Sequence, residues 1–299
     1  MNAPQPLPRV LAHPQALAQR AGWHASLALH VGLREQRSVP LVRRHSGPLR
    51  LLRGYRHDAA IDGVSGWEQI IVHPPGGIAA GDSLSIEATA GSGSRLLLTA
   101  PGAAKWYRGR LGAPARQLLR LSVQPGAHLE WLPMETILYD GARAEIENNL
   151  RVASDASLIA ADLICLGRPA GERPFRRGLL RQCTRLWVDG RLAFIERNLL
   201  DAEQGHANTV AALGSAQAFG NMFIVPRDPA HIESLLAEAR EALRPFAGEV
   251  AATALPRVLI VRWRGDRAEH GWQALRAVWR ALRMKINGQQ PEPPRIWAC

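Results

Sequence analysis

Cysteine is scarce in this sequence, and the positions of the three that occur argue against cross-links. Cys165, Cys183 and Cys299 lie far apart, and no CxxC or CxxH spacing occurs in the chain. A structural zinc site needs closely spaced thiolate or imidazole ligands, and disulfides do not persist in a reducing compartment. We therefore expect reduced thiols that are mostly buried.

Long apolar runs are absent as well. No segment approaches the roughly 18 uninterrupted apolar residues that a transmembrane helix needs. The first 21 residues hold four prolines and no apolar signal region. These absences favour a cytoplasmic protein without a membrane anchor.

Lysine is rare, although the chain is strongly basic. Lys105 and Lys285 are its only lysines, so arginine supplies the rest of the 37 basic residues behind a net charge of +11. A basic balance suggests an acidic partner such as nucleic acid. The arginines are spread along the chain and form no polybasic tail. The charge therefore indicates an acidic partner surface without identifying it.

Apolar residues are plentiful, at 46% of the chain, which is enough for a substantial core. Alternating apolar positions over 23–31, 119–123, 146–152 and 180–188 predict half-buried strands. The last of these patterns leads into Asp189-Gly190, a strong signal for a two-residue hairpin. Strand patterns separated by Gly, Pro, Asn or Asp turns predict a mainly β fold, in a sandwich, a barrel or stacked coils.

The last quarter of the chain has a different pattern. Asp228-Pro229 predicts a helix start, and apolar residues then follow helical spacing to Leu243. A strand over 258–263 precedes a second helix, which ends near Asn287-Gly288. We therefore expect two α-helices packed on the β body. The predicted division is a flexible tail over 1–21 and one domain over 22–299, with a β body over 22–225 and a helix, strand, helix and extended tail over 226–299.

The loop HPPGGIAAGD, residues 73–82, is rich in glycine and follows an apolar strand. Nucleotide-binding loops open a helix, and here an alternating strand pattern follows instead. A rigid turn is the better interpretation, because proline fixes φ and glycine allows positive φ. Asp82 stays a candidate for chemistry. The residues that we interpret as architectural are His73, Pro74, Pro75, Gly76, Gly77 and Gly81.

The segment TAPGAAKWYRG, residues 99–109, interleaves basic and aromatic side chains. Lys105, Tyr107 and Arg108 would suit stacking against nucleic-acid bases. The same residues would suit a core aromatic cluster with a lysine reaching to solvent. We favour the core interpretation.

Carboxylates cluster in residues 129–147, where Glu130, Glu135 and Asp140 lie close to Trp131. Two of them would suffice for acid and base in a hydrolase. No His, Ser or Cys nearby completes an acyl-transfer arrangement. Charges beside apolar residues call for a partner or a cavity.

The segment ICLGRPAGERPF, residues 164–175, places a turn of Gly167, Arg168 and Pro169 after Cys165. We interpret Cys165 as a small buried apolar residue. Arg168 is suited to hold a carboxylate in bidentate fashion.

An ordered set of stretches resembles the UreD (UreH) family of urease accessory proteins. With the closing PRIW, the resemblance covers nearly the whole chain. The chain departs from the family's pattern at Trp67-Glu68, where many members have Cys-His, and at Ala80 and Met134, which replace a glycine and a glutamine. A Cys-His metal pair is thus dispensable here, or metal is handled differently. The stretches are RRHSGPLR (43–50), HPPGGIAAGD (73–82), PGAAKWYR (101–108), LEWLPMETILYDGA (129–142) and LGRPAGE (166–172).

This resemblance implies a β-helix-like body with two helices and a non-enzymatic role. UreD-like proteins bind apo-urease and UreF, and UreF recruits the GTPase UreG. The assembly delivers nickel to urease, and the proposed route of the ion is an internal passage through the UreD-like protein. No tightly bound cofactor and no tight metal site are expected, only transient Ni(II). The C-terminal helices and the tail over 291–299 are the candidate UreF surface.

Carboxylates near apolar walls would bind Ni(II) weakly enough to let it move on. For each of them the alternative is a salt bridge to one of the many arginines. Two other functions stay open, a basic nucleic-acid-binding β protein and, ranked last, a carboxylate hydrolase. The candidate residues for the nickel passage are Asp82, Glu130, Glu135 and Asp140, with Glu68 and Glu172 as weaker candidates.

Overall fold

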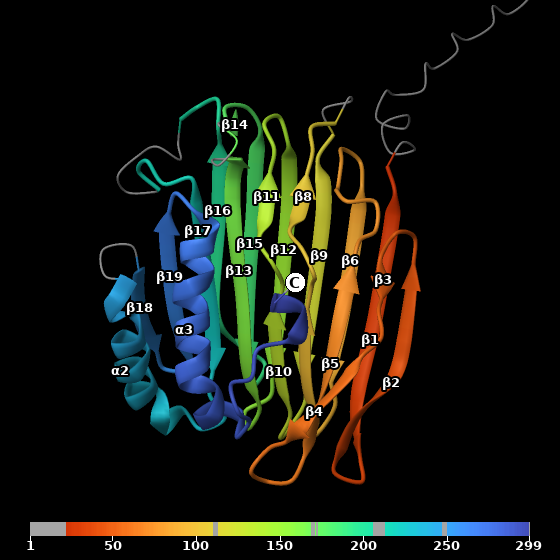
Figure 1. Ribbon diagram of the computed structural model, residues 1–299, viewed down its shortest axis with the longest axis vertical. Helices are drawn as coiled ribbons and strands as arrows, with labels where there is room; N and C mark the ends of the chain where they lie inside the picture. The colour runs from red at the N-terminus through yellow and green to blue at the C-terminus, as the bar shows by residue number, and fades with distance from the viewer. Residues whose placement is uncertain are drawn as a thin grey trace, which may run out of the picture.

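The computed structural model describes residues 22–109, 113–168, 171, 173–205, 213–246 and 250–298. Strand follows strand through this part of the chain, and both α-helices lie in the last quarter, as the sequence predicts (Figure 1). The predicted tail over 1–21 lies outside the described residues. Neither described helix is long and apolar enough to cross a membrane.

Seven strands form one wall, which we call the outer sheet, in the order β2–β1–β6–β9–β12–β15–β16. The pairs from β1 to β15 are parallel, and the antiparallel hairpins β1–β2 and β15–β16 close its two ends. One face of each strand is buried and the other is accessible, which explains the alternation in the sequence. The strands are β1 (His24–Arg34), β2 (Arg37–Ser46), β6 (Ser83–Ala90), β9 (Ala115–Val123), β12 (Arg143–Val152), β15 (Leu179–Val188) and β16 (Arg191–Asp201).

Eight strands form the facing wall, the inner sheet, in the order β4–β5–β7–β10–β13–β17–β19–β18. β7 and β17 are buried along their whole length because both faces of this sheet are covered. Its strands are β4 (Tyr55–Ala59), β5 (Ser65–Val72), β7 (Arg95–Thr99), β10 (His128–Leu132), β13 (Ser157–Arg168), β17 (Ala218–Val225), β18 (Val250–Leu255) and β19 (Val258–Gly265). The short strands are β3 (Arg50–Leu51), β8 (Ala104–Trp106), β11 (Thr136–Leu138) and β14 (Arg173–Pro174).

The chain winds between the two sheets in successive coils, each of which crosses from the inner to the outer sheet. Tight turns at 91–94, 124–127 and 153–156 bring it back, and they stack on one another. Ser157, for example, donates its backbone N–H to the carbonyl of Ala127 in the coil before. The stacked-coil fold that the resemblance implies is therefore confirmed.

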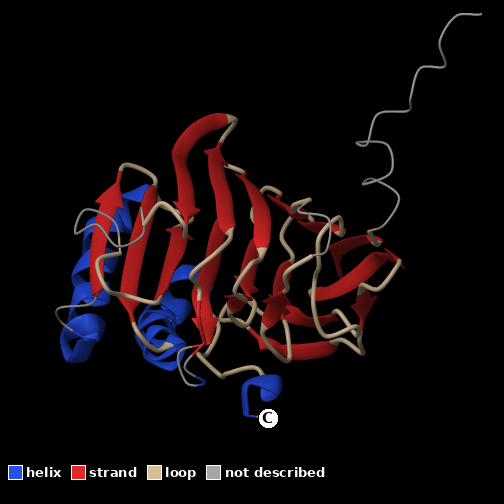
Figure 2. Ribbon diagram, turned by 90° about the horizontal axis from the view of Figure 1, so that it is seen from above, coloured by secondary structure: helices blue, strands red, loops and turns tan. Residues whose placement is uncertain are grey.

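Two helices, α2 (Ile232–Leu243) and α3 (Ala268–Asn287), cover the outward side of the inner sheet (Figures 1 and 2). Both predicted ends are confirmed. Asp228 caps the 3-10 turn η3 (Pro229–His231) ahead of α2, and Gly288 ends α3 at a φ of 71°. The remaining short helices are η4 (Arg244–Phe246) and η5 (Arg295–Ala298).

Two details of the last quarter differ from the prediction. A strand that the sequence does not predict, β18, pairs with β19 as a hairpin. Its sequence, VAATAL, is dominated by small residues and carries no clear alternation. In the tail, which we expected to be extended throughout, the described part ends in η5.

Candidate functional site

The quoted motifs lie in the long loops that connect the coils, and these loops stack at the end of the sheets opposite the tight turns. Ile78 forms a bridge with Trp106, β8 pairs with β11, and β11 pairs with β13. The register aligns the buried side chains of Trp106, Leu138 and Leu166. Motifs far apart in the sequence therefore share one apolar ladder.

The HPPGG loop is a rigid turn, as predicted. Gly76 and Gly81 have φ values of 76° and 84°, which other residues rarely adopt. The Asp82 carboxylate accepts hydrogen bonds from the backbone N–H of Ala79 at 2.8 Å and of Trp23 at 2.7 Å. Asp82 thereby fixes the loop and joins it to the start of β1.

The aromatic segment after β8 packs into this end of the protein. Trp106 is buried, and the Tyr107 ring lies 4.6 Å from the Tyr139 ring, between centroids. Burial and the neighbouring Tyr139 raise the pKa of Tyr107. A Cβ added at Gly77 would come within 2.0 Å of the Tyr107 ring, so only glycine fits there. Trp106 fits the core interpretation of the segment, whereas Tyr107 is 37% exposed and Arg108 is also exposed.

A cavity of about 370 Å³ lies between the two sheets, beside the motif loops. Inward side chains of both sheets form its apolar walls, including Trp131 and Ile146. Burial lowers the pKa of His73 at the cavity's edge, and Asp82 opposes this shift. Lys105 of β8 lines the cavity, together with loop residues that include His73, Pro74, Gly76, Gly77, Pro101, Gly102, Pro133 and Met134.

Part of the cavity wall is polar, and Asp162 belongs to this part. Gln182 donates from Nε2 to Asp162 Oδ2 at 2.7 Å, and the Asn221 backbone N–H donates to Oδ1 at 3.1 Å. Asn148, also on the wall, donates to the Thr184 hydroxyl at 3.1 Å. Burial, together with the nearby Glu196, raises the pKa of Asp162 to about 6.

Polar side chains continue from Asp162 to the protein surface. Asn198 donates to Gln182 Oε1 at 3.0 Å, and Asn221 donates to Glu196 Oε2 at 3.1 Å. Glu196 also forms an ion pair with Arg262, whose side chain is 52% exposed, against 11% for Glu196. The hydrogen-bonded chain therefore links the cavity to solvent.

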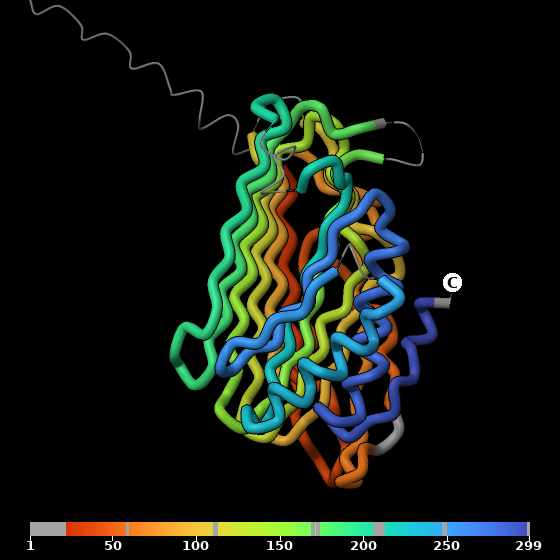
Figure 3. The backbone as a smooth tube through the Cα atoms, turned by 90° about the vertical axis from the view of Figure 1, so that its left-hand side faces the viewer, coloured from red at the N-terminus to blue at the C-terminus, as the bar shows by residue number. Residues whose placement is uncertain are grey.

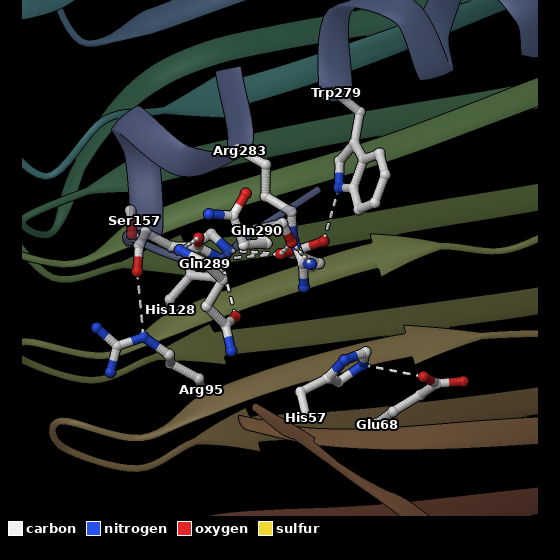
Figure 4. Close-up of polar contacts among 11 residues, drawn as sticks. His57, Glu68, Arg95, His128, Ser157, Trp279, Arg283, Gln289 and Gln290 are labelled. Carbon is white, nitrogen blue, oxygen red and sulfur yellow. Dashed lines mark hydrogen bonds and ion pairs between the residues drawn. The ribbon is translucent and has the colours of Figure 1, made fainter. Parts of the chain in front are cut away.

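A second polar cluster, which includes His128, Trp279 and Arg283, lies between the inner sheet and α3 (Figure 4). Glu130 belongs to this cluster and is 1% exposed. Its Oε1 accepts from Arg283 Nε at 2.8 Å, Asn287 Nδ2 at 2.9 Å and His128 Nε2 at 3.1 Å. Its Oε2 accepts from Trp279 Nε1 at 2.8 Å. Burial alone would raise the pKa of Glu130, but Arg283 and His128 hold it well below its usual value. Burial lowers the pKa of His128, which favours the neutral ring.

The other predicted carboxylates also have polar or cationic neighbours. Glu68 lies 2.9 Å from His57 Nε2, and Glu135 accepts from Trp272 Nε1 at 3.2 Å. Asp140 pairs with Arg177 at 2.6 Å, and this pairing holds the pKa of Asp140 below its usual value against the effect of burial.

None of the five described candidates, Asp82 included, lines the cavity. Glu130 and Asp140 each form an ion pair with an arginine, which was the alternative to a role in the nickel passage. Their predicted role in nickel transfer stays a prediction.

Four further predicted site residues lie at the last motif. Gly167, with a φ of 84°, and the exposed Arg168 lie at the end of β13 and pair with β14, so these two residues are not in the predicted turn. Pro169 and Glu172 lie outside the described residues. Cys165 is buried, as predicted, and burial raises the pKa of its thiol to about 12. Within the described ranges, no three His, Cys, Asp or Glu side chains come together as a metal-binding group.

The sequence predictions missed the polar wall of the cavity. The sequence of β13, SLIAADLICLGR, is apolar, and Asp162 is its only charged residue apart from Arg168 at the end. A lone carboxylate inside a strand that is buried on both faces signals a cavity or a buried partner. Asn148, Gln182 and Asn198 carry no such signal, because amides are common on strands with one accessible face.

Comparison with known proteins shows that the chain is similar to one family along nearly its whole length. A family model described as UreD urease accessory protein matches residues 24–298. Urease accessory protein UreD 2 of Pseudomonas syringae pv. syringae (strain B728a) is 38% identical over 278 residues, or 92% of this chain and 95% of the relative. UreD of Azoarcus sp. (strain BH72) is 37% identical over 94% of this chain and 95% of its own. UreD of Pseudomonas aeruginosa (strain PAO1) is 36% identical over 98% of both chains.

Proposed function

Because this chain belongs to the UreD family of urease accessory proteins, we propose that it is a non-catalytic scaffold that delivers nickel to apo-urease in the cytoplasm. In this proposal it binds apo-urease and UreF, and it meets the GTPase UreG through UreF. GTP hydrolysis then belongs to UreG. The sequence supports this assignment, because it contains no phosphate-binding P-loop of its own.

We further propose that Ni(II) crosses the chain through the cavity between the two sheets. The observation that carries this proposal is the polar wall at Asp162, Asn148 and Gln182, which continues through Glu196 to the surface. A buried polar group is costly unless it is hydrogen-bonded, and these groups are hydrogen-bonded to one another. The polar wall that they form suits water or a hydrated cation as the content of the cavity.

The chemistry of this wall suits transfer more than storage. Ni(II) accepts carboxylate and water ligands, and a site with one carboxylate and amide oxygens holds it less firmly than a set of thiolates or imidazoles. With a pKa raised to about 6, Asp162 is charged at neutral pH. Acidification then protonates it and removes the charge that would attract the ion.

The test is co-purification of the chain with apo-urease and UreF, followed by nickel-dependent activation of urease with UreG and GTP. Asp162→Asn and Asn148→Leu alter the cavity wall. Asp155→Asn is the control for the lost charge, since Asp155 is exposed in the tight turn at 153–156 and does not line the cavity. We expect the cavity variants to assemble normally but to activate urease more slowly than the control.

Two outcomes would contradict these proposals. Full activation by both cavity variants would remove the cavity from the nickel route and leave the scaffold role intact. Failure of the unmodified chain to bind apo-urease or UreF, or to affect activation, would remove the scaffold role itself.

A further inference from the structure

The outer sheet presents its accessible face on the side of the molecule opposite α2 and α3 (Figure 3). Outward positions of β9, β12 and β15 alternate with buried ones, so side chains two residues apart share this face. Seven arginines, three glutamates and Asp201 point outward from β6, β9, β12, β15 and β16. We call this surface the basic face.

Arginines already neutralise the glutamates of the basic face. Glu145 lies between Arg116, at 2.7 Å, and Arg181, at 3.7 Å. Glu147 lies 2.7 Å from Arg185. The arginine side chains of the first two pairs are more than 60% exposed, so water screens these ion pairs, which contribute little to stability.

Three arginines of the basic face have no carboxylate partner in the described part of the chain. Arg143 and Arg197 are exposed, and Arg151 stacks over the Trp187 ring at 5.2 Å. The face thus keeps an excess of positive charge after its internal ion pairs are formed. Partners of opposite potential are attracted to such a surface and oriented by it.

The edge strand β16 adds apolar surface to the same face. Leu192, Ile195 and Leu199 are 52%, 41% and 55% exposed. Among the described strands β16 pairs only with β15, so its other edge keeps free backbone donors and acceptors. Exposed apolar residues along an unpaired edge are a liability in a protein that stays alone.

We propose that the basic face, with the edge of β16, is the docking surface for an acidic protein partner. A second copy of this chain fits poorly, because pairing β16 with itself would bring Arg197 close to its own copy. The apolar residues favour a protein over a bare phosphate backbone, whose contacts are mainly ionic. This inference rests on the proposed function only for the choice of binding partners.

Binding assays with purified apo-urease and purified UreF, each tested separately, examine this surface. The variant is the double charge reversal Arg143→Glu with Arg197→Glu. Its matched control, Arg53→Glu with Arg56→Glu, changes the charge equally at two exposed arginines on and beside β4. We expect the variant to lose at least about tenfold in affinity for one of the two proteins, and the control to bind as the unmodified chain does.

Cys183 provides a second measurement on the same face. It lies on β15 between Glu147 of β12 and Arg197 of β16, whereas Cys165 is buried. In a Cys299→Ser background, N-ethylmaleimide should modify Cys183, and the bound partner should slow that modification. The salt dependence of binding should also be steeper for the unmodified chain than for the charge-reversed variant.

Each remaining outcome overturns the proposal in a distinguishable way. Unchanged affinity of the variant for both proteins, with Cys183 still reactive in the complex, removes the basic face as a docking surface but leaves the scaffold role. A duplex oligonucleotide that binds the unmodified chain and not the variant, while protein binding is unchanged, reassigns the face to nucleic acid. If the unmodified chain binds neither protein, the proposed function and this inference both fall.

Discussion

At the scale of single residues, Glu130 shows how the protein keeps a carboxylate charged in a dry interior. Four side chains donate to it, and one of them, Arg283, is also a full positive charge at 2% exposure. Removing a carboxylate from water is costly, and only such a complete set of donors offsets the cost. The cluster therefore fixes α3 in one position on the inner sheet.

Replacing Glu130 by alanine should leave the Arg283 charge buried without a counter-charge. We expect Glu130→Ala to lower the free energy of unfolding by about 3–5 kcal/mol. The double variant Glu130→Ala with Arg283→Met should lose less than the sum of the two single changes, because it also removes the orphaned charge. Urea unfolding of the four proteins measures this, and strictly additive losses would show that the pair is not coupled.

Asp162 should make stability depend on pH in the opposite direction from an ordinary ion-paired carboxylate. Burial raises its pKa to about 6 in the folded protein, above the ordinary value of 3.8. Between these values the folded state binds more protons than the unfolded state, so the stability contributed by Asp162 falls as pH rises. The stability of the unmodified chain relative to Asp162→Asn should therefore decrease from about pH 4 to about pH 6 and then level off. Thermal unfolding of both proteins across this range is the measurement, and a flat difference would contradict it.

Single residues also show which features of the site could be predicted from the sequence alone. Glu130 lies next to Trp131 in an apolar strand, which indicates that a partner exists. Its partners Trp279 and Arg283 lie 149 and 153 residues away, so only the fold identifies them. Asp162 was missed because the apolar stretch around it received no interpretation in the sequence analysis, although a lone acid in such a stretch is itself a signal.

At the scale of elements, prediction was most successful where a local signal was strong. Asp189-Gly190 forms the predicted hairpin, with φ values of 53° and 72°. The hairpin between β1 and β2 was not predicted, since its turn residues are Glu35 and Gln36, which rarely adopt positive φ. Both do so here, at 47° and 59°, because the antiparallel pair on either side dictates the turn.

Substitutions in the turns of these two hairpins should change the free energy of unfolding in opposite directions. Gln36→Gly should raise the free energy of unfolding by a few tenths to about 1 kcal/mol, because relief of the strained φ exceeds the added entropy of the unfolded chain. Gly190→Ala should lower it by about 1 kcal/mol, since alanine at a φ of 72° is strained. Denaturant midpoints of the two variants test the pair, and a shift in the same direction for both would contradict the turn geometry.

At the scale of the whole molecule, three layers face one another: the outer sheet, the inner sheet and the helices. One apolar core lies between the sheets and a second between the inner sheet and the helices. Trp297 of the C-terminal tail closes the second layer. Its Nε1 donates to the Thr99 hydroxyl at 3.0 Å, and its ring lies 5.4 Å from the ring of Trp279. The tail is thus part of the packed structure.

Removal of the Trp297 ring should loosen this whole side of the protein. We expect Trp297→Ala to lower the free energy of unfolding by about 2–3 kcal/mol, less than for a fully buried tryptophan because the ring is only half-buried. Trp23→Ala, at a side chain 55% exposed, is the control and should have little effect. Thermal unfolding compares the two variants, and equal effects would show that the tail contributes nothing to the packing.

The long separation between Glu130 and Arg283 has a consequence for synthesis on the ribosome. The coils emerge first, and during that time Glu130 has no counter-charge and the inner sheet has no helix over its apolar side. The nascent β body must wait for α3 before these groups are satisfied. A chain interrupted shortly before Trp279 would therefore contain every described strand and still lack a stable native state, which makes synthesis of α3 the step that commits this protein to its fold.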